Sequence, residues 1–341
     1  MPIFVDGIDH YSTAAQGGRK WDVFQLADII TSGGRNNSGY VVMVTGSSMI
    51  RKHYASTNHV ILQYGLRVDY GSSNYGLCVL ESPAGGSHSY LQLLFDGSIR
   101  YYRGGNTGTV LATTAGGTVS GGVWHYLEVE QTLSTGGLST GSCVVKLNGQ
   151  TIINLSSVNN NLHATEYPTM CALTGGASGA HYVDDLVLVT GTEAAPFNTL
   201  FGDWAVRTLW VNGAGSSTQF TPLSGTNWSN VDETYPDDDT TYVESATVGQ
   251  RDLYAMTDLP ASVVSVLGVQ ATPTIRKNDA GTRQFANVVH RAGTNTVGAT
   301  LTCTSAYAAG LQTMFRFDPI TGIAPTPAQV NAYEAGYDVV T

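Results

Sequence analysis

The sequence predicts an all-β protein of two domains, and three observations point to this class. Short runs with an apolar residue at every second position recur along the chain, as they do in half-buried strands. Glycine contributes 40 of the 341 residues, which suits many tight turns between strands. Charged residues make up only 12% of the chain, and helical proteins normally carry far more Glu and Lys. A chain of this length suggests about two domains, each large enough to bury its own core.

The most informative stretch is 124–155, which contains three alternating runs and two turns. Between the second and third runs, Asn148-Gly149 favours a hairpin, because both residues tolerate the positive φ of a type I′ turn. We therefore expect an antiparallel meander with one buried face. The positions predicted to point inward are Leu127, Val129, Cys143, Val145, Leu147, Ile153 and Leu155.

The other parity of the first run carries Trp124, Tyr126, Glu128 and Glu130. The two carboxyl groups leave the same face of the strand, because side chains two positions apart point the same way. Such a pair can approach the roughly 5–5.5 Å separation that a retaining glycosidase requires. We expect a solvated outer face, and we treat polysaccharide cleavage by Glu128 and Glu130 as the alternative.

The sequence pattern changes after about residue 190, where small residues and one proline replace the alternation of apolar and polar residues. We place a first domain at 1–191, a linker at 192–203 and a second β-rich domain at 204–341. Near the C-terminus, 326–329 (Thr-Pro-Ala-Gln) has the form of a capping box with proline at the first helical position. This pattern predicts a short helix, which Gly336 can close.

Three segments in order resemble the concanavalin A-like or laminin G-like jelly roll. They are the opening segment FVDGIDHY (4–11), the Trp124-His125 strand with its Asn-Gly hairpin, and the segment YVDDLVLV (182–189), which resembles the closing strand. The opening segment is also similar to such domains in virion proteins of tailed bacteriophages. Further along, FRFDPITGIAPTPAQVNAYEAGY resembles the second half of those proteins. The resemblance implies an N-terminal jelly-roll sandwich followed by a smaller β-rich assembly domain with a short C-terminal helix.

This resemblance implies a virion structural protein, tail-associated or fibre-like, that is assembled in the host cytoplasm. Its partners would be other virion proteins, further copies of the chain in a homo-oligomer, and a glycan of the host surface. One alternative is a capsid-decorating protein of the same fold. Another is a carbohydrate-binding lectin or a polysaccharide depolymerase. On the main interpretation the protein is not an enzyme.

Aromatic residues supply the candidate glycan contacts, because tyrosine and tryptophan offer flat amphipathic surface to sugars. The candidates are Trp124, Tyr126, Tyr101 and Tyr102. Asp184 and Asp185 are the candidate metal ligands. As neighbours on one strand they leave opposite faces, so one ion would need several further oxygen ligands. We expect no cofactor, with calcium as the one ion that the sequence leaves open.

Several other classes are disfavoured. A net charge of −10 repels phosphate backbones, which argues against nucleic-acid binding. No apolar run approaches the roughly 20 residues needed to cross a bilayer, and the N-terminus shows no secretory signal pattern. The cysteines have no metal-like or redox-like spacing, so we expect buried thiols. They are Cys78, Cys143, Cys171 and Cys303.

Overall fold

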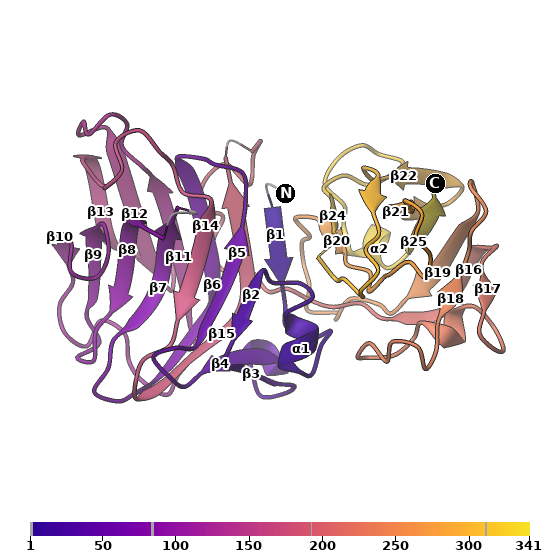
Figure 1. The fold of residues 1–341 in the computed structure, drawn as a ribbon, viewed down its shortest axis with the longest axis horizontal. Coiled ribbons are helices and arrows are strands. Elements are labelled where there is room, and N and C mark those ends of the chain that lie inside the picture. The colour runs from indigo at the N-terminus through magenta and orange to yellow at the C-terminus, as the bar shows by residue number, and fades with distance from the viewer. Residues whose placement is uncertain (1–2, 83–84, 192, 311) are drawn as a thin grey trace. The chain divides into compact units, whose positions relative to one another are not determined.

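The computed structural model describes residues 3–82, 85–191, 193–310 and 312–341. It separates into two compact units, Met1–Val206 and Arg207–Thr341 (Figure 1). Both units consist of antiparallel strands with short helical turns, so the predicted all-β class is confirmed. No helix within these described ranges combines the length and the apolar character needed to cross a bilayer.

One layer of the first unit is an eight-stranded sheet, sheet A, in which β1 (Ile3–Asp6) pairs with β15. The predicted meander forms its edge, with Leu127 opposite Leu147 and Val129 opposite Val145. The order of the other strands across sheet A is β13 (Gln150–Val158), β12 (Gly141–Leu147), β11 (His125–Thr132), β6 (His59–Tyr70), β15 (Gly179–Thr190), β4 (Tyr40–Met43) and β3 (Ala27–Ile30).

The second layer of the first unit is a seven-stranded sheet, sheet B. The connections of this unit also contain α1 (Ala14–Gly17) and a 3-10 turn at Arg35–Asn37. The order of strands across sheet B is β10 (Thr109–Thr113), β9 (Ile99–Arg103), β8 (Ser87–Leu93), β7 (Tyr75–Glu81), β14 (Met170–Thr174), β5 (Met49–His53) and β2 (Val23–Gln25).

The core of the first unit lies between the inner faces of sheets A and B. All the inward positions predicted for the meander belong to it, with Leu155 packed at its margin and the others buried. Between β12 and β13, φ is 50° at Asn148 and 78° at Gly149, as a type I′ turn requires. The four cysteines are buried free thiols, as expected.

The second unit contains a six-stranded sheet and two short strand pairs, with a 3-10 turn at Trp228–Asn230. The six strands are β16 (Val211–Thr218), β19 (Arg251–Met256), β25 (Glu334–Val339), β21 (Gln284–Arg291), β22 (Thr294–Val297) and β23 (Leu301–Thr302). The pairs are β17 (Thr221–Pro222) with β18 (Val243–Glu244), and β20 (Val269–Ala271) with β24 (Thr313–Phe315).

The predicted C-terminal helix exists as α2 (Pro327–Val330). Its capping box is complete, because Thr326 and Gln329 each accept a hydrogen bond from the backbone N–H of the other. The expected stop at Gly336 is wrong. The helix ends after one turn, and Gly336 lies in β25, where a Cβ would sit 1.8 Å from the carbonyl oxygen of Asp252. This glycine is therefore required by a close approach between strands.

Residues 197–206, here named the strap, run along the outer face of sheet A. Phe197 is buried, and the N–H of Gly202 donates to Glu128 Oε1 at 3.1 Å. Glu128 itself is only 1% exposed. The expectation of a solvated outer face is therefore wrong, because the strap covers the acidic parity of β11.

The strap also bears on the segment 192–203, which the sequence predicts as a linker. Thr192 lies outside the described residues. At the far end of the strap, the N–H of Val206 donates to Asp185 Oδ1 of β15 at 2.7 Å. Most of the predicted linker thus lies against the first unit, and the division between the two units falls after Val206.

Candidate functional site

The outer face of sheet B carries a row of polar side chains across four neighbouring strands. In the antiparallel register Gln92 of β8 lies opposite both Arg100 of β9 and Gly76 of β7. Gly76 in turn lies opposite Thr174 of β14. Residues that face each other in an antiparallel pair share one face of the sheet. Since Leu91 and its parity fill the core, this row points away from it.

A second row lies beside the first on the same face. Tyr90 is opposite Tyr102 on one side and Val79 on the other. Val79 is opposite Ala172, which is opposite Arg51. The rings of Tyr90 and Tyr102 meet edge to face, with centroids 6.4 Å apart. Two aromatic rings and an arginine therefore flank the polar row.

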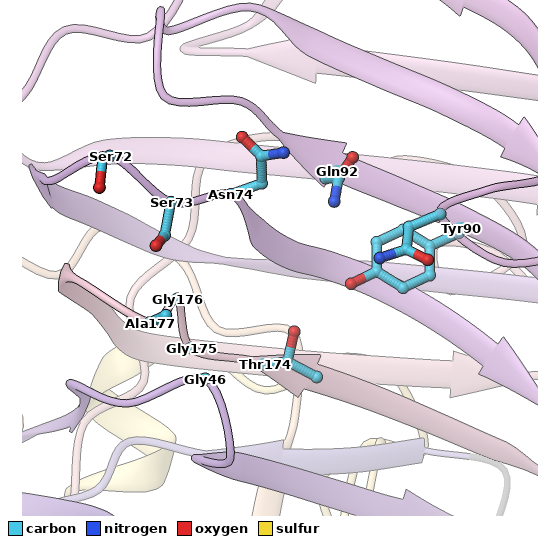
Figure 2. Close-up of a pocket in the computed structure, with 11 residues that line it drawn as sticks. Gly46, Ser72, Ser73, Asn74, Tyr90, Gln92, Thr174, Gly175, Gly176 and Ala177 are labelled. Carbon is cyan, nitrogen blue, oxygen red and sulfur yellow. The ribbon is translucent and has the colours of Figure 1, made fainter.

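A hollow of about 340 Å³ opens at the end of the first row, where the strands turn (Figure 2). Tyr90 and Thr174 form part of its wall, and their hydroxyl groups are hydrogen bonded to each other. Figure 2 shows the hydroxyl end of Tyr90 directed toward Thr174. The lining consists of Gly46, Ser72, Ser73, Asn74, Tyr90, Gln92, Asn106, Thr174, Gly175, Gly176 and Ala177.

Gly76 allows the two hydroxyl groups to meet. Its N–H donates to Thr174 Oγ1 at 3.0 Å. A Cβ at this position would lie 2.5 Å from Thr174 Oγ1 and 2.9 Å from the hydroxyl oxygen of Tyr90. A Cβ essentially never approaches a non-bonded atom this closely, so any side chain here would displace both hydroxyl groups.

A chain of hydrogen bonds links the hollow to an arginine. The hydroxyl of Tyr102 donates to Gln92 Oε1 at 3.1 Å, and Arg100 Nη1 donates to the hydroxyl of Tyr102 at 3.4 Å. Because Gln92 accepts with Oε1, its Nε2 amide group remains as a donor on the face that lines the hollow.

An exposed aromatic side chain stands next to this site. The N–H of Phe95 donates to the side-chain oxygen of Asn74, which lines the hollow, at 3.1 Å. The side chain of Phe95 is 61% exposed. An exposed aromatic ring offers a flat apolar surface, so Phe95 is a candidate stacking surface.

His88 lies two residues before Tyr90 on β8, at an irregularity in the pairing with β7, where Leu80 is opposite Ser89 and Glu81 is opposite Ser87. The Nδ1 of His88 is 2.7 Å from Asn161 Oδ1, which fixes Nδ1 as the protonated nitrogen. Burial lowers the pKa of His88, so the ring is neutral at pH 7. Its Nε2 lone pair is buried and has no hydrogen-bond partner among the described residues.

The candidate glycan contacts named from the sequence lie in three different places: the core, the side of sheet A and the outer face of sheet B. Tyr101 is buried in the core, where its hydroxyl donates to Gln131, and Tyr126 is buried under the guanidinium of Arg35. Trp124 packs edge to face on Tyr40, on the side of sheet A. Tyr102 alone of the four lies on the outer face of sheet B. At 4% exposure it supports Gln92 more than it offers surface to a ligand.

The alternative catalytic pair, Glu128 and Glu130, makes hydrogen bonds to other residues of the protein. Glu130 accepts hydrogen bonds from His59 Nε2 and from the hydroxyl of Thr199, both at 3.1 Å. The bond with His59 is the main reason that the pKa of Glu130 is lowered. Glu128 is buried beneath the strap, which does not favour cleavage of a polysaccharide by this pair; that alternative stays a prediction.

Asp184 and Asp185 hold neighbouring loops to β15. Arg35 Nη1 donates to Asp185 Oδ2 at 2.9 Å, and the side chain of Asp185 is fully buried. The Ser38 hydroxyl lies 2.6 Å from Asp184 Oδ2. No cluster of three or more candidate metal-ligating side chains is found in the described part of the chain. We therefore describe the pair as a structural tether, and a calcium role stays a prediction.

The raised pKa of Asp184 predicts that the stability of the protein depends on pH. Burial and the neighbouring charge of Asp185 raise this pKa from 3.8 to about 8. Between these values the folded protein retains a proton that the unfolded chain has lost, so the free energy of unfolding should fall as pH rises. The slope from one such group is at most about 1.4 kcal/mol per pH unit. Urea unfolding at several pH values should show this slope, and Asp184→Asn should remove it. An unchanged slope in the variant would contradict the raised pKa.

The two antiparallel sheets of the first unit are consistent with the jelly-roll sandwich predicted from the sequence. No protein-family model matches the sequence, and neither does any curated protein. Solved structures similar to this chain include an endo-β-1,4-glucuronan lyase from the fungus Trichoderma reesei, with a TM-score of 0.38, 14% identity, and coverage of 50% of this chain and 91% of that one. Alginate lyase Aly36B has a TM-score of 0.38, 13% identity, and coverage of 55% and 97%. Galectin LEC-6 of Caenorhabditis elegans has a TM-score of 0.30, 14% identity, and coverage of 44% and 95%.

These likenesses concern the fold alone. They correct one expectation from the sequence, that the protein is not an enzyme, because proteins of similar fold include polysaccharide lyases. The expected virion origin gains no support from them.

Sequence reasoning missed the outer face of sheet B. The run SHSYLQL (87–93) alternates, and its outward parity is His88, Tyr90 and Gln92. Three polar or aromatic side chains on one face of a strand are a signal that could have marked the site. The glycine opposite them gives no such signal, because the chain has 40 glycines and most serve turns.

Proposed function

We propose that the outer face of sheet B binds a glycan, with the hollow receiving part of it. The observation that carries this proposal is the convergence of Gln92, Tyr90 and Thr174 on one hollow with the exposed ring of Phe95 beside it. Hydroxyl and amide groups match the hydroxyl groups of a sugar, and an aromatic ring matches its apolar face. The hollow's volume of about 340 Å³ lies at the lower end of the range of small-molecule sites.

The test is binding of the purified protein to a glycan array, followed by calorimetry with each bound glycan. Phe95→Ala and Gln92→Ala should each weaken binding by about tenfold or more, which corresponds to about 1.4 kcal/mol. Phe317→Ala is the matched control, because Phe317 is 56% exposed in the second unit, far along the sequence. If both site variants bound as tightly as the control, this face would not be the glycan site.

Cleavage of the bound polysaccharide is a second candidate, favoured by the pairing of His88 with Tyr90. A neutral imidazole and a phenol close together on one strand are suited to general base and general acid roles. The ring of His163 packs on that of His88, with centroids 4.7 Å apart. Movement of the His163 side chain away from this position would expose Nε2 of His88. New reducing ends from a bound polysaccharide, lost in His88→Ala, would support cleavage, and intact polymer after prolonged incubation would exclude it.

The resemblance of the sequence to tailed-bacteriophage proteins supports a further proposal about setting. We place the protein in a virion, as a tail-associated component or as a capsid decoration, in contact with other virion proteins and with copies of itself. Glycan binding by the first unit would then serve attachment to a host surface. Mass spectrometry of purified particles tests this setting, and absence of the protein from them would refute it.

A further inference from the structure

Arg100 is a cation on the proposed glycan-binding face, and its two hydrogen-bond acceptors are neutral. Its Nε donates to Thr113 Oγ1 at 3.3 Å and its Nη1 to the hydroxyl of Tyr102 at 3.4 Å. Both acceptors are neutral, and no ion pair within 4.0 Å joins Arg100 to a carboxylate of the described residues. Asp96, in the neighbouring turn, accepts hydrogen bonds from the N–H and hydroxyl of Ser98, and these bonds, together with a smaller contribution from the charge of Arg100, lower the pKa of Asp96.

Among the described residues, the strand positions of this face named above carry no unpaired carboxylate. Arg51 is paired with Glu81, with Nη2 and Oε2 2.7 Å apart. The side chains that line the hollow are all uncharged. A chain with 26 acidic and 16 basic residues therefore has no carboxylate among the side chains that line this hollow. Such an arrangement removes the repulsion that the net charge of −10 would otherwise impose on an anion.

The donors of the hollow also suit an anion. Gln92 offers an Nε2 amide group. Ser72 and Ser73 also line the hollow, with hydroxyl oxygens that each lie 3.2 Å from the hydroxyl oxygen of Ser178. Arg100 connects to Gln92 through the hydroxyl of Tyr102. A guanidinium with free N–H groups binds carboxylate and sulfate oxygens in a planar, two-point geometry that neutral groups cannot match.

We infer that the glycan is anionic, and that Arg100 pairs with a carboxylate or sulfate group on it. This inference rests on the proposed glycan-binding function and specifies the chemical class of its ligand. Arg100 determines the preference for charge, whereas Phe95 and Gln92 contact the sugar.

The experiment compares polysaccharides with and without their charge. Oligogalacturonate is paired with its methyl ester, which removes the carboxylate charge but keeps the sugar, and dextran sulfate is paired with dextran. We expect the acid form of at least one pair to bind at least about tenfold more tightly than its neutral form. Added salt should weaken binding of the acid form. In Arg100→Gln the preference should disappear, while Arg283→Gln, at an exposed ion pair in the second unit, should retain it.

The outcomes separate the inference from the proposed function. Equal or tighter binding of the neutral forms would overturn the inference and leave glycan binding standing. A preference that survives in Arg100→Gln would overturn the role of Arg100. If neither these polymers nor any glycan of the array bound, the proposed function and the inference would fall together.

Discussion

Replacing Arg35 with alanine should lower the free energy of unfolding by about 3–5 kcal/mol, the usual cost of breaking a buried ion pair. Arg35 donates to Asp185 and to the carbonyl oxygen of Trp204, both at 2.9 Å, and also contacts Asp203. The side chain of Asp185 is 0% exposed, so the variant would leave a buried carboxylate without its cation. Chemical denaturation monitored by tryptophan fluorescence measures the loss.

Arg67→Ala is the matched control. The guanidinium groups of Arg35 and Arg67 each lie 4.7 Å from the centre of a tyrosine ring. Arg67 differs in its partner, because the side chain of Asp69 is 42% exposed. We expect Arg67→Ala to cost less than about 1 kcal/mol, as surface ion pairs usually do. Equal losses in the two variants would mean that stacking on tyrosine, not the buried carboxylate, stabilises the strap.

Replacing Gly76 with alanine should abolish measurable glycan binding, a loss of at least about 100-fold, or about 2.7 kcal/mol. The added methyl group would displace the hydroxyl groups of Thr174 and Tyr90, which it approaches to 2.5 and 2.9 Å. The backbone of Gly76 does not have a positive φ, so the effect is steric and not conformational. Calorimetry with the glycan that binds the unaltered protein measures the loss.

Gly213→Ala provides the control for this change. Gly213 lies in β16 of the second unit, and a Cβ there would find its nearest neighbour, Ala255 Cβ, at an ordinary 3.6 Å. We expect unchanged glycan binding. Thermal unfolding of both variants shows whether each remains folded. A folded Gly76→Ala protein that binds normally would remove the hollow from the site.

The meander shows what local sequence determines. Alternation placed Leu127 and Val129 in the core, and Asn148-Gly149 placed the hairpin, because both signals act over a few residues. The same alternation identified Glu128 as outward but could not say what covers it. Its partner, Gly202, lies 74 residues away, and no local pattern records such a contact.

Only part of the candidate site could be predicted from the sequence, for a related reason. Tyr90 and Gln92 are visible as one parity of a single strand, but Thr174 reaches them only because β7 and β14 are neighbours in sheet B. Strand order across a sheet is set by the whole fold, not by any one segment. The four glycan contacts proposed from the sequence therefore lie in three separate places, and only Tyr102 lies on the outer face of sheet B.

The strap sets a lower limit on the length of an autonomous N-terminal fragment. Ending the chain at residue 191, where alternation stops, would delete the amide groups of Gly202 and Val206 and remove one hydrogen-bond donor each from Glu128 and Asp185. Ending it at Val206 keeps both amides and the buried ring of Phe197. The natural unit for dissection, crystallisation or fusion is thus 15 residues longer than the strands alone suggest.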